Sequence, residues 1–149
     1  MTSTTLDLVV QKILDSLSRQ VPGYAGSEWD WKNCQGNVAA CIICPDGRVH
    51  GRIWGTDKLK GRRYYDVAYR KASQVWITGY ATNEFERLVF SDQVNYKEFG
   101  IELPDLVGWL GGQLFKLDEE TTIYCGFSGF RGVTDIAVFK QAVAEALAG

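Results

Sequence analysis

Apolar residues recur at helical spacing near the start of the chain. Leu6, Val10 and Ile13 lie three or four positions apart, and this spacing predicts an amphipathic helix over residues 5–19. Pro22 follows shortly afterwards, which favours the end of the helix. We therefore expect the chain to begin with a helix that buries one face.

Two strands joined by a tight turn are predicted next. Residues 36–44 form a mostly apolar run, and residues 48–54 alternate in character. Asp46 and Gly47 lie between them and favour a hairpin turn. Alternate residues of a strand share one face. One face of the return strand then carries Arg48, His50, Arg52 and Trp54.

Helical spacing returns in the middle of the chain and again at its end. It predicts a helix over residues 62–78 that ends at Gly79, and a shorter helix with Thr82 as its N-terminal cap. A last helix is predicted from about residue 134 to residue 147.

Three short strands are predicted between these helices, over residues 106–110, 113–117 and 122–127. Strands and helices do not alternate as they do in a parallel sheet. The sequence therefore predicts one domain over residues 1–149 of the α+β class. We expect a single antiparallel sheet of about five strands with flanking helices.

Composition and charge exclude several classes of function. The net charge of the 149 residues is −2, which gives no general attraction to nucleic acid. No apolar run has the length of a membrane span, and no secretory signal pattern opens the chain. We expect a cytoplasmic protein with a small-molecule ligand and neither a nucleic-acid nor a membrane partner.

The four cysteines do not predict a metal site. Cys41 and Cys44 match a CxxC spacing, but both fall in a predicted strand, where positions three apart face opposite sides. Two such thiols cannot share one metal ion or form a local disulfide easily. We expect buried, reduced thiols.

A glycine-rich loop between the last strand and the last helix is the best candidate for a ligand site. Residues 128–132 leave a strand and enter a helix, where backbone N–H groups can face an anion. A basic and aromatic segment opens the helix at residues 62–78, and we expect it to form the opposite wall. The residues expected to contact the ligand are Arg62, Arg63, Tyr64, Tyr65, Ser128, Gly129, Arg131, Gly132, Asp135, His50 and Trp54.

No established catalytic motif is present. The chain has no phosphate-binding loop, dinucleotide fingerprint or nucleophile elbow. Three residues are candidates for acid–base work: His50, Tyr65 and Asp135. His50 is the single histidine. A haem ligand or a general base is one interpretation, but a lone histidine without an identified partner favours a histidine hydrogen-bonded across the sheet.

Four motifs, taken in order, resemble the GlcG/HbpS family of haem-binding-like proteins with a profilin-like α+β fold. They are the Asp46-Gly47 turn, Asp66-Val-Ala68 with Lys71-Ala72, Gly111-Gly112, and Gly126-Phe-Ser128-Gly129 with Asp135. The chain has Gln113-Leu114 after its double glycine, where the family has a proline. The resemblance implies a small-molecule pocket and possible haem binding, for which no axial ligand is identified.

Three functions follow as hypotheses. The first is a small-molecule-binding protein of the GlcG/HbpS type, for haem or another flat anion. The second is a cofactor-independent isomerase, cyclase or lyase that uses the same pocket. The third is a profilin-like interaction module. The resemblance also implies a homo-oligomer, as does a basic segment over residues 57–71 that contrasts with an acidic segment over residues 83–120.

Overall fold

The computed structural model describes residues 1–149, which form five α-helices, two short 3-10 helices and four strands. In chain order the elements are α1 (Ser3–Gln20), η1 (Val21–Tyr24), α2 (Glu28–Trp31), β1 (Val38–Ile43), β2 (Val49–Trp54), α3 (Lys58–Thr78), α4 (Thr82–Phe90), η2 (Tyr96–Phe99), β3 (Gly112–Lys116), β4 (Thr122–Ser128) and α5 (Gly132–Ala148). The strands form one antiparallel sheet in the order β2-β1-β4-β3.

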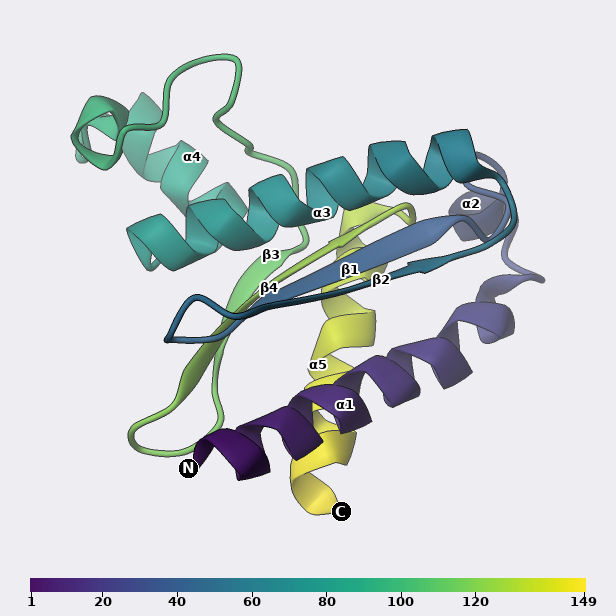
Figure 1. The fold of residues 1–149 in the computed structure, drawn as a ribbon. Helices are drawn as coiled ribbons and strands as arrows, with labels where there is room; N and C mark the ends of the chain where they lie inside the picture. The colour runs from purple at the N-terminus through teal and green to yellow at the C-terminus, as the bar shows by residue number, and fades with distance from the viewer.

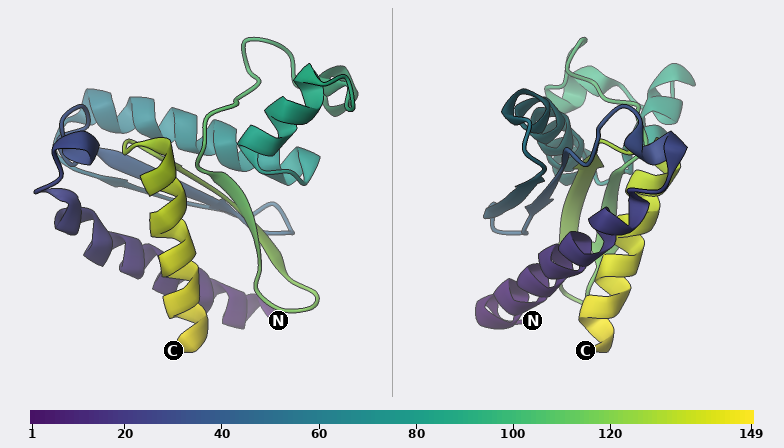
Figure 2. Two further views of the ribbon diagram at one scale, coloured as in Figure 1. Left: turned by 180° about the vertical axis from the view of Figure 1, so that it is seen from behind. Right: turned by 90° about the vertical axis from the view of Figure 1, so that its right-hand side faces the viewer.

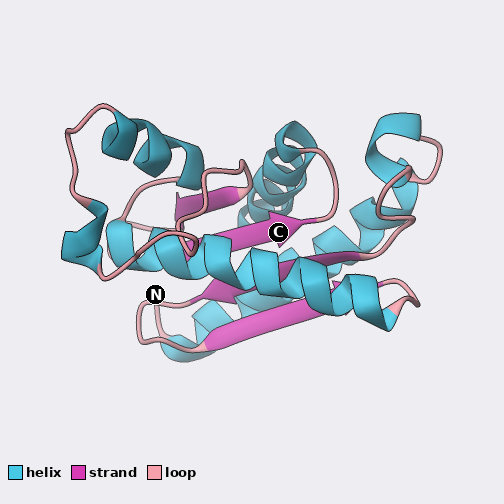
Figure 3. Cartoon of the chain, turned by 90° about the horizontal axis from the view of Figure 1, so that it is seen from above, coloured by secondary structure: helices cyan, strands magenta, loops and turns pink.

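Helices cover both faces of this sheet (Figure 1). The long helix α3 lies across one face, as the view from above shows (Figure 3). Helices α1 and α5 pack against each other on the other face (Figure 2). Helix α4 and the segment that follows it lie beyond one end of α3 (Figure 1). The site described below lies on the α3 face.

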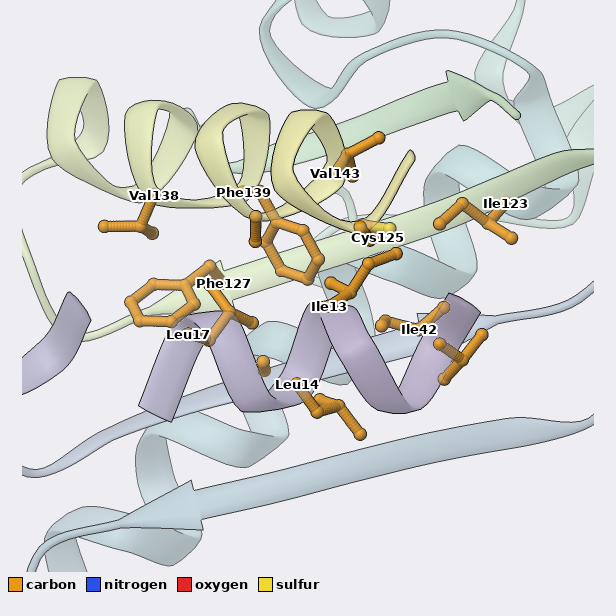
Figure 4. Close-up of a cluster of buried hydrophobic side chains, with 14 of the residues drawn as sticks. Ile13, Leu14, Leu17, Ile42, Ile123, Cys125, Phe127, Val138, Phe139 and Val143 are labelled. Atoms are coloured by element: carbon orange, nitrogen blue, oxygen red, sulfur yellow. The ribbon is translucent and has the colours of Figure 1, made fainter. Parts of the chain in front are cut away.

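The larger core lies between the sheet and the α1–α5 layer. Ile42 and Phe127 project from the central strands and meet Ile13, Leu17 and Phe139 from the two helices (Figure 4). All five side chains are buried. Strand alternation sends the neighbouring residues of β1 to the smaller cluster under α3. The central strands are therefore buried on both faces.

Glycine allows α3 to lie very close to the sheet. A Cβ atom at Gly126 would collide with the carbonyl oxygen of Ala68, and one at Gly51 would lie 2.5 Å from the Tyr65 ring. Ala68 and Ala72 supply the small side chains of the helix at this contact. The close approach places the middle of α3 directly over the end of β4.

The fold differs from the sequence prediction in strand number. The sheet has four strands, because residues 106–110 form no strand. Side chains satisfy the backbone of this segment instead. The Gln74 amide donates to the Val107 carbonyl over 2.7 Å and accepts from the Val107 N–H over 2.8 Å. The Thr82 hydroxyl donates to the Trp109 carbonyl.

Helix starts also differ from the predictions, most clearly at α3 and α4. Helix α3 begins four residues earlier than expected, because Asp57 caps it through the N–H groups of Leu59 and Lys60. Thr82 is inside α4 and does not cap it, since its hydroxyl binds the 106–110 segment. The cysteines behave as expected: all four are buried and free, with Cys41 under α3 and Cys44 on the opposite face.

None of the helices combines the length and apolar character that crossing a bilayer requires.

Candidate functional site

A cavity of about 680 Å³ lies where α3, the β4–α5 connection and residues 108–110 meet. Its walls combine two cationic side chains, one carboxylate and several aromatic or apolar groups. The lining residues are Asn33, Arg63, Tyr64, Val67, Lys71, Gly108, Trp109, Leu110, Ser128, Gly129, Phe130, Gly132 and Asp135. The volume suits a small organic molecule.

Lys71 and Asp135 meet at the wall of the cavity as a buried ion pair. The Lys71 Nζ atom lies 3.4 Å from Asp135 Oδ2 and donates to the Phe127 carbonyl over 2.8 Å. Each side chain is only 3% exposed. Lys71 reaches Asp135 because α3 lies so close to the end of β4, where Phe127 sits.

Burial changes the proton affinity of both members of this pair. Desolvation raises the pKa of Asp135 to about 8, although the charge and hydrogen bond of Lys71 oppose that shift. Desolvation lowers the pKa of Lys71, although Asp135 opposes it. Removal from water thus favours the uncharged form of each group, and perturbed pairs of this kind are common at functional sites.

Two carboxylates of the chain already occupy donors of the glycine-rich loop. Asp135 accepts from the Phe130 N–H over 3.1 Å. Asp30 accepts from the Arg131 N–H over 3.1 Å. The N–H groups of Gly129 and Gly132 form no hydrogen bond within the chain, and both residues line the cavity. The loop therefore offers a ligand fewer donors than its sequence predicts.

Backbone conformation explains the glycine at position 129. Its φ of +132° lies in a region that other residues rarely adopt. A Cβ atom there would also lie 2.6 Å from Val38 Cγ1. At Gly132 a Cβ atom would lie 2.8 Å from that of Leu110. These glycines let the loop pass close to β1 and to the cavity rim.

Trp109 is an exposed aromatic side chain on a fixed backbone. The residue lines the cavity, yet it is 68% exposed. Gln74 and Thr82 hold the surrounding backbone through the hydrogen bonds described above. A large aromatic surface is thus held at the cavity rim without being buried in the core.

Six of the expected contact residues lie at this cavity: Arg63, Tyr64, Ser128, Gly129, Gly132 and Asp135. Arg62 and Tyr65 do not, because they line a separate groove of about 750 Å³ along α3, between Leu59 and Arg70. Arg63 borders both spaces. Successive residues of a helix point in different directions, so Arg62 and Tyr65 are separated from the cavity that Arg63 and Tyr64 line.

Arg131 is also absent from the cavity walls. Its Nε and Nη2 atoms donate to the two oxygens of Asp30 over 3.1 and 3.3 Å. The Arg131 side chain is thus engaged by a carboxylate of the chain that lies 101 positions earlier.

His50 and Trp54 lie on the opposite face of the sheet from the cavity. They pair with Ile42 and Val38, which face the α1–α5 layer. The Trp54 Nε1 atom donates to Ser18 of α1 over 2.9 Å. The His50 Nε2 atom is shielded from solvent and has no hydrogen-bond partner. The two residues were wrongly grouped with the loop because alternation shows which residues share a face, and does not show what covers it.

Lys71 is a cavity residue that the predicted contact set omits, although its sequence carries a signal. It follows Ala68 by three positions and precedes Ala72, so a lysine falls on the apolar stripe of the helix. A lysine at a buried position requires a partner. Asn33, Val67, Gly108 and Leu110 were missed without any such signal, because only the folded chain brings them together.

Solved structures with the same architecture share little sequence with this chain. A double mutant of Streptomyces reticuli HbpS is 17% identical, with 97% of this chain and 88% of that chain covered at a TM-score of 0.62. The chain has the HbpS fold. The complex of PduOC with haem is also 17% identical, over 97% of this chain and 93% of that chain, with a TM-score of 0.60.

Klebsiella pneumoniae protein ORFY is 16% identical over 92% of this chain and 88% of that chain, with a TM-score of 0.63. No protein-family model matches the sequence, and no curated protein matches it. The likeness of fold confirms the architecture implied by the resemblance to HbpS-like proteins.

Proposed function

We propose that the protein binds a small, flat organic anion in the cavity beside Lys71 and Asp135. One observation carries the proposal. Lysine and arginine side chains from α3 line the same 680 Å³ space as an exposed tryptophan held at its rim. Cations and aromatic faces together are suited to a planar molecule that carries a carboxylate.

Arg63 is the cation that a ligand meets first. Its side chain borders the cavity and forms no ion pair within the chain, whereas Lys71 is held by Asp135 and the Phe127 carbonyl. The free N–H groups of Gly129 and Gly132 add neutral donors. A carboxylate placed between Arg63 and this loop would receive charge-assisted hydrogen bonds.

Tyr64 and Trp109 give the cavity its aromatic surface. Stacking on a preformed aromatic platform favours flat ligands of various substitution, because any planar π system presents a face. Since Gln74 and Thr82 fix the backbone around Trp109, only the side chain of this residue has to become ordered when a ligand binds.

Haem is associated with one protein of this fold, PduOC, and its iron would need an axial ligand among the lining residues. The cavity contains no histidine, cysteine or methionine. His50 lies on the opposite face of the sheet, and Lys71 is already engaged. Tyr64 is the single lining residue of a type that ligates haem iron. The donor set therefore fits a planar anion without axial ligation better than it fits haem.

Protoporphyrin IX and haemin test this proposal, because they share a flat dicarboxylate frame and differ in the iron. Titration followed by tryptophan fluorescence should give comparable affinities for the two. Arg63→Ala should weaken both by about 10- to 100-fold, as expected for a lost charge-assisted hydrogen bond. Arg62→Ala is the matched control, since Arg62 lies one position away and outside the cavity.

Three results would overturn the proposal. The first is that neither porphyrin binds. The second is an equal loss of affinity in the Arg63→Ala and Arg62→Ala variants. The third is haemin binding that disappears in His50→Ala. The last result would show that the iron is held on the other face of the sheet.

The buried pair favours a second candidate function, a cofactor-independent enzyme that transfers protons. Burial raises the pKa of Asp135 to about 8, which suits a group that exchanges a proton near neutral pH. His50 and Tyr65, the other acid–base candidates, lie outside the cavity. Incubation with small keto and hydroxy acids in D₂O should then give solvent exchange at carbon that Asp135→Asn abolishes; no exchange with the parent protein would exclude this activity for those acids.

A further inference from the structure

Strand β2 forms an open edge of the sheet, because it pairs with β1 and with no other strand. The register shows which of its backbone groups are free. The Cys44 N–H donates to the Arg48 carbonyl, so residue 48 and alternate residues after it direct their backbone groups toward β1. Val49, Gly51 and Ile53 therefore direct their N–H and C=O groups outward.

The same three positions form an apolar strip on the α3 side of the sheet. Val49 and Ile53 are 48% and 51% exposed, and they pair with Ile43 and Ala39, which lie in the cluster under α3. Gly51 lies midway between them. Free backbone groups and exposed β-branched side chains thus coincide on one edge.

Charged side chains do not protect this edge. Proteins commonly block an exposed edge strand with lysine, proline or an uncompensated charge. The arginines of the β2 hairpin are instead turned toward α1. Arg48 pairs with Asp7 at 2.6 Å, and Arg52 donates to Ser18 at 2.8 Å and lies 3.4 Å from Asp15. The other edge strand, β3, ends in the exposed Lys116.

From this arrangement we propose that β2 pairs with β2 of a second copy of the chain, antiparallel about a two-fold axis at Gly51. Val49 of each copy then lies opposite Ile53 of the other, and the two Gly51 residues face each other. All three are hydrogen-bonded pairs of an antiparallel ladder. The edge is self-complementary, as a two-fold interface requires.

The distribution of charge also favours a second copy of the chain as the partner of β2. On the α1 side this register places Arg52 of one copy opposite His50 of the other, and Arg48 opposite Trp54. Asp7 and Asp15 already compensate both arginines within each copy. Within the two paired strands, the register therefore brings together backbone ladders and apolar side chains without opposing unpaired like charges.

Sedimentation velocity over a range of protein concentration tests the interface. The parent chain should sediment as a dimer, and Ile53→Lys should shift it to the monomer at the same concentration. Leu114→Lys is the matched control, because it places the same charge on the other edge strand and should leave the dimer intact. A monomeric parent at high micromolar concentration, or a dimer that Ile53→Lys does not alter, would overturn the proposal.

Cysteine cross-linking tests the register independently of any loss of stability. Val49→Cys and Ile53→Cys chains, mixed and oxidised, should form a disulfide-linked heterodimer, because paired Cα atoms lie about 5.5 Å apart in such a ladder. Neither variant alone should cross-link, because residue 49 of one copy pairs with residue 53 of the other and lies four residues away from the other copy's residue 49. The native cysteines are buried and do not compete. Equal cross-linking of a single variant and the mixture would contradict this register, and larger aggregates would show open-ended association.

Discussion

Asp30 of α2 and Arg131 join that short helix to the start of α5. The Asp30 carboxylate accepts from the Arg131 backbone N–H at 3.1 Å and from the guanidinium at 3.1 and 3.3 Å. The carboxylate is buried, while half of the arginine side chain is exposed. This contact holds the glycine-rich loop in place beside the cavity. Arg131 therefore belongs to the support of the site.

Replacing Asp30 should destabilise the protein. Asp30→Ala removes the acceptor of the Arg131 N–H and leaves a helix start without its partner, so we expect a loss of about 1–3 kcal/mol in the free energy of unfolding. Urea denaturation measures it. Asp7→Ala is a suitable control, because Asp7 forms an exposed ion pair with Arg48 and should change stability far less. Equal losses in the two variants would contradict a supporting role for Asp30.

The same carboxylate predicts a dependence of stability on acid pH. Burial raises the pKa of Asp30, but the hydrogen bonds and charge of Arg131 outweigh this and lower it below 3.8. The unfolded chain then takes up a proton before the folded chain does as the pH falls. The stability from Asp30 is present above about pH 4 and is lost as the pH falls through the folded-state pKa.

Denaturation curves of the parent and Asp30→Asn check this dependence. The difference in unfolding free energy between them should shrink as the pH falls below about 4. A constant difference across that range would show that the carboxylate charge does not contribute.

Several parts of this architecture could be predicted from sequence because local pattern determines them. The spacing of Leu6, Val10 and Ile13 identified α1, and the Asp46–Gly47 turn identified the β1–β2 hairpin. Contacts between distant segments could not be predicted this way. Residue 30 and residue 131 are 101 positions apart, and no local rule pairs them.

The missing strand at residues 106–110 has a similar cause. Its apolar sequence fits a strand, but Gln74 and Thr82 satisfy its backbone groups from other helices. Of the candidate site, the sequence identified the loop, Asp135 after it, and Arg63 and Tyr64 of α3. Arg62 and Tyr65 were misplaced because the neighbours of a helical residue point in different directions.

A steric prediction concerns Gly129. Gly129→Ala should lower stability by about 1–3 kcal/mol, because the new Cβ atom meets Val38 and the φ of +132° is strained for alanine. Gly23→Ala is the control, since a Cβ atom there meets nothing within 4 Å. Thermal unfolding of both variants distinguishes them. A Gly129→Ala melting temperature equal to that of Gly23→Ala would show that the loop adapts without cost.

The Lys71–Asp135 pair leads to the last prediction. Lys71→Met removes the cation that opposes the desolvation of Asp135 and the donor to the Phe127 carbonyl, so it should reduce stability at neutral pH by about 1–3 kcal/mol. The variant with both Lys71→Met and Asp135→Asn should recover part of this loss. It has no buried charge, and the Asn side chain can still accept from the Phe130 N–H. Equal stability of the single and double variants would show that the pair is not coupled.

The stability of the Lys71→Met variant should also change with pH, in a direction that packing alone does not predict. Burial raises the pKa of Asp135 to about 8 from 3.8, so between these values the folded chain holds a proton that the unfolded chain has released. Stability from this group is present below about pH 4 and is lost as the pH rises through about 8. In the parent, the lowered pKa of Lys71 has the opposite effect on stability. The folded chain then binds fewer protons than the unfolded chain, so stability rises with pH where Lys71 titrates. Without the Lys71 charge the pKa of Asp135 rises further, so the unfolding free energy of Lys71→Met should continue to fall above about pH 8, where the contribution of Asp135 ends in the parent. Urea denaturation from about pH 6 to about pH 10 measures both curves, and parallel curves above about pH 8 would mean that Lys71 does not oppose the shift of Asp135.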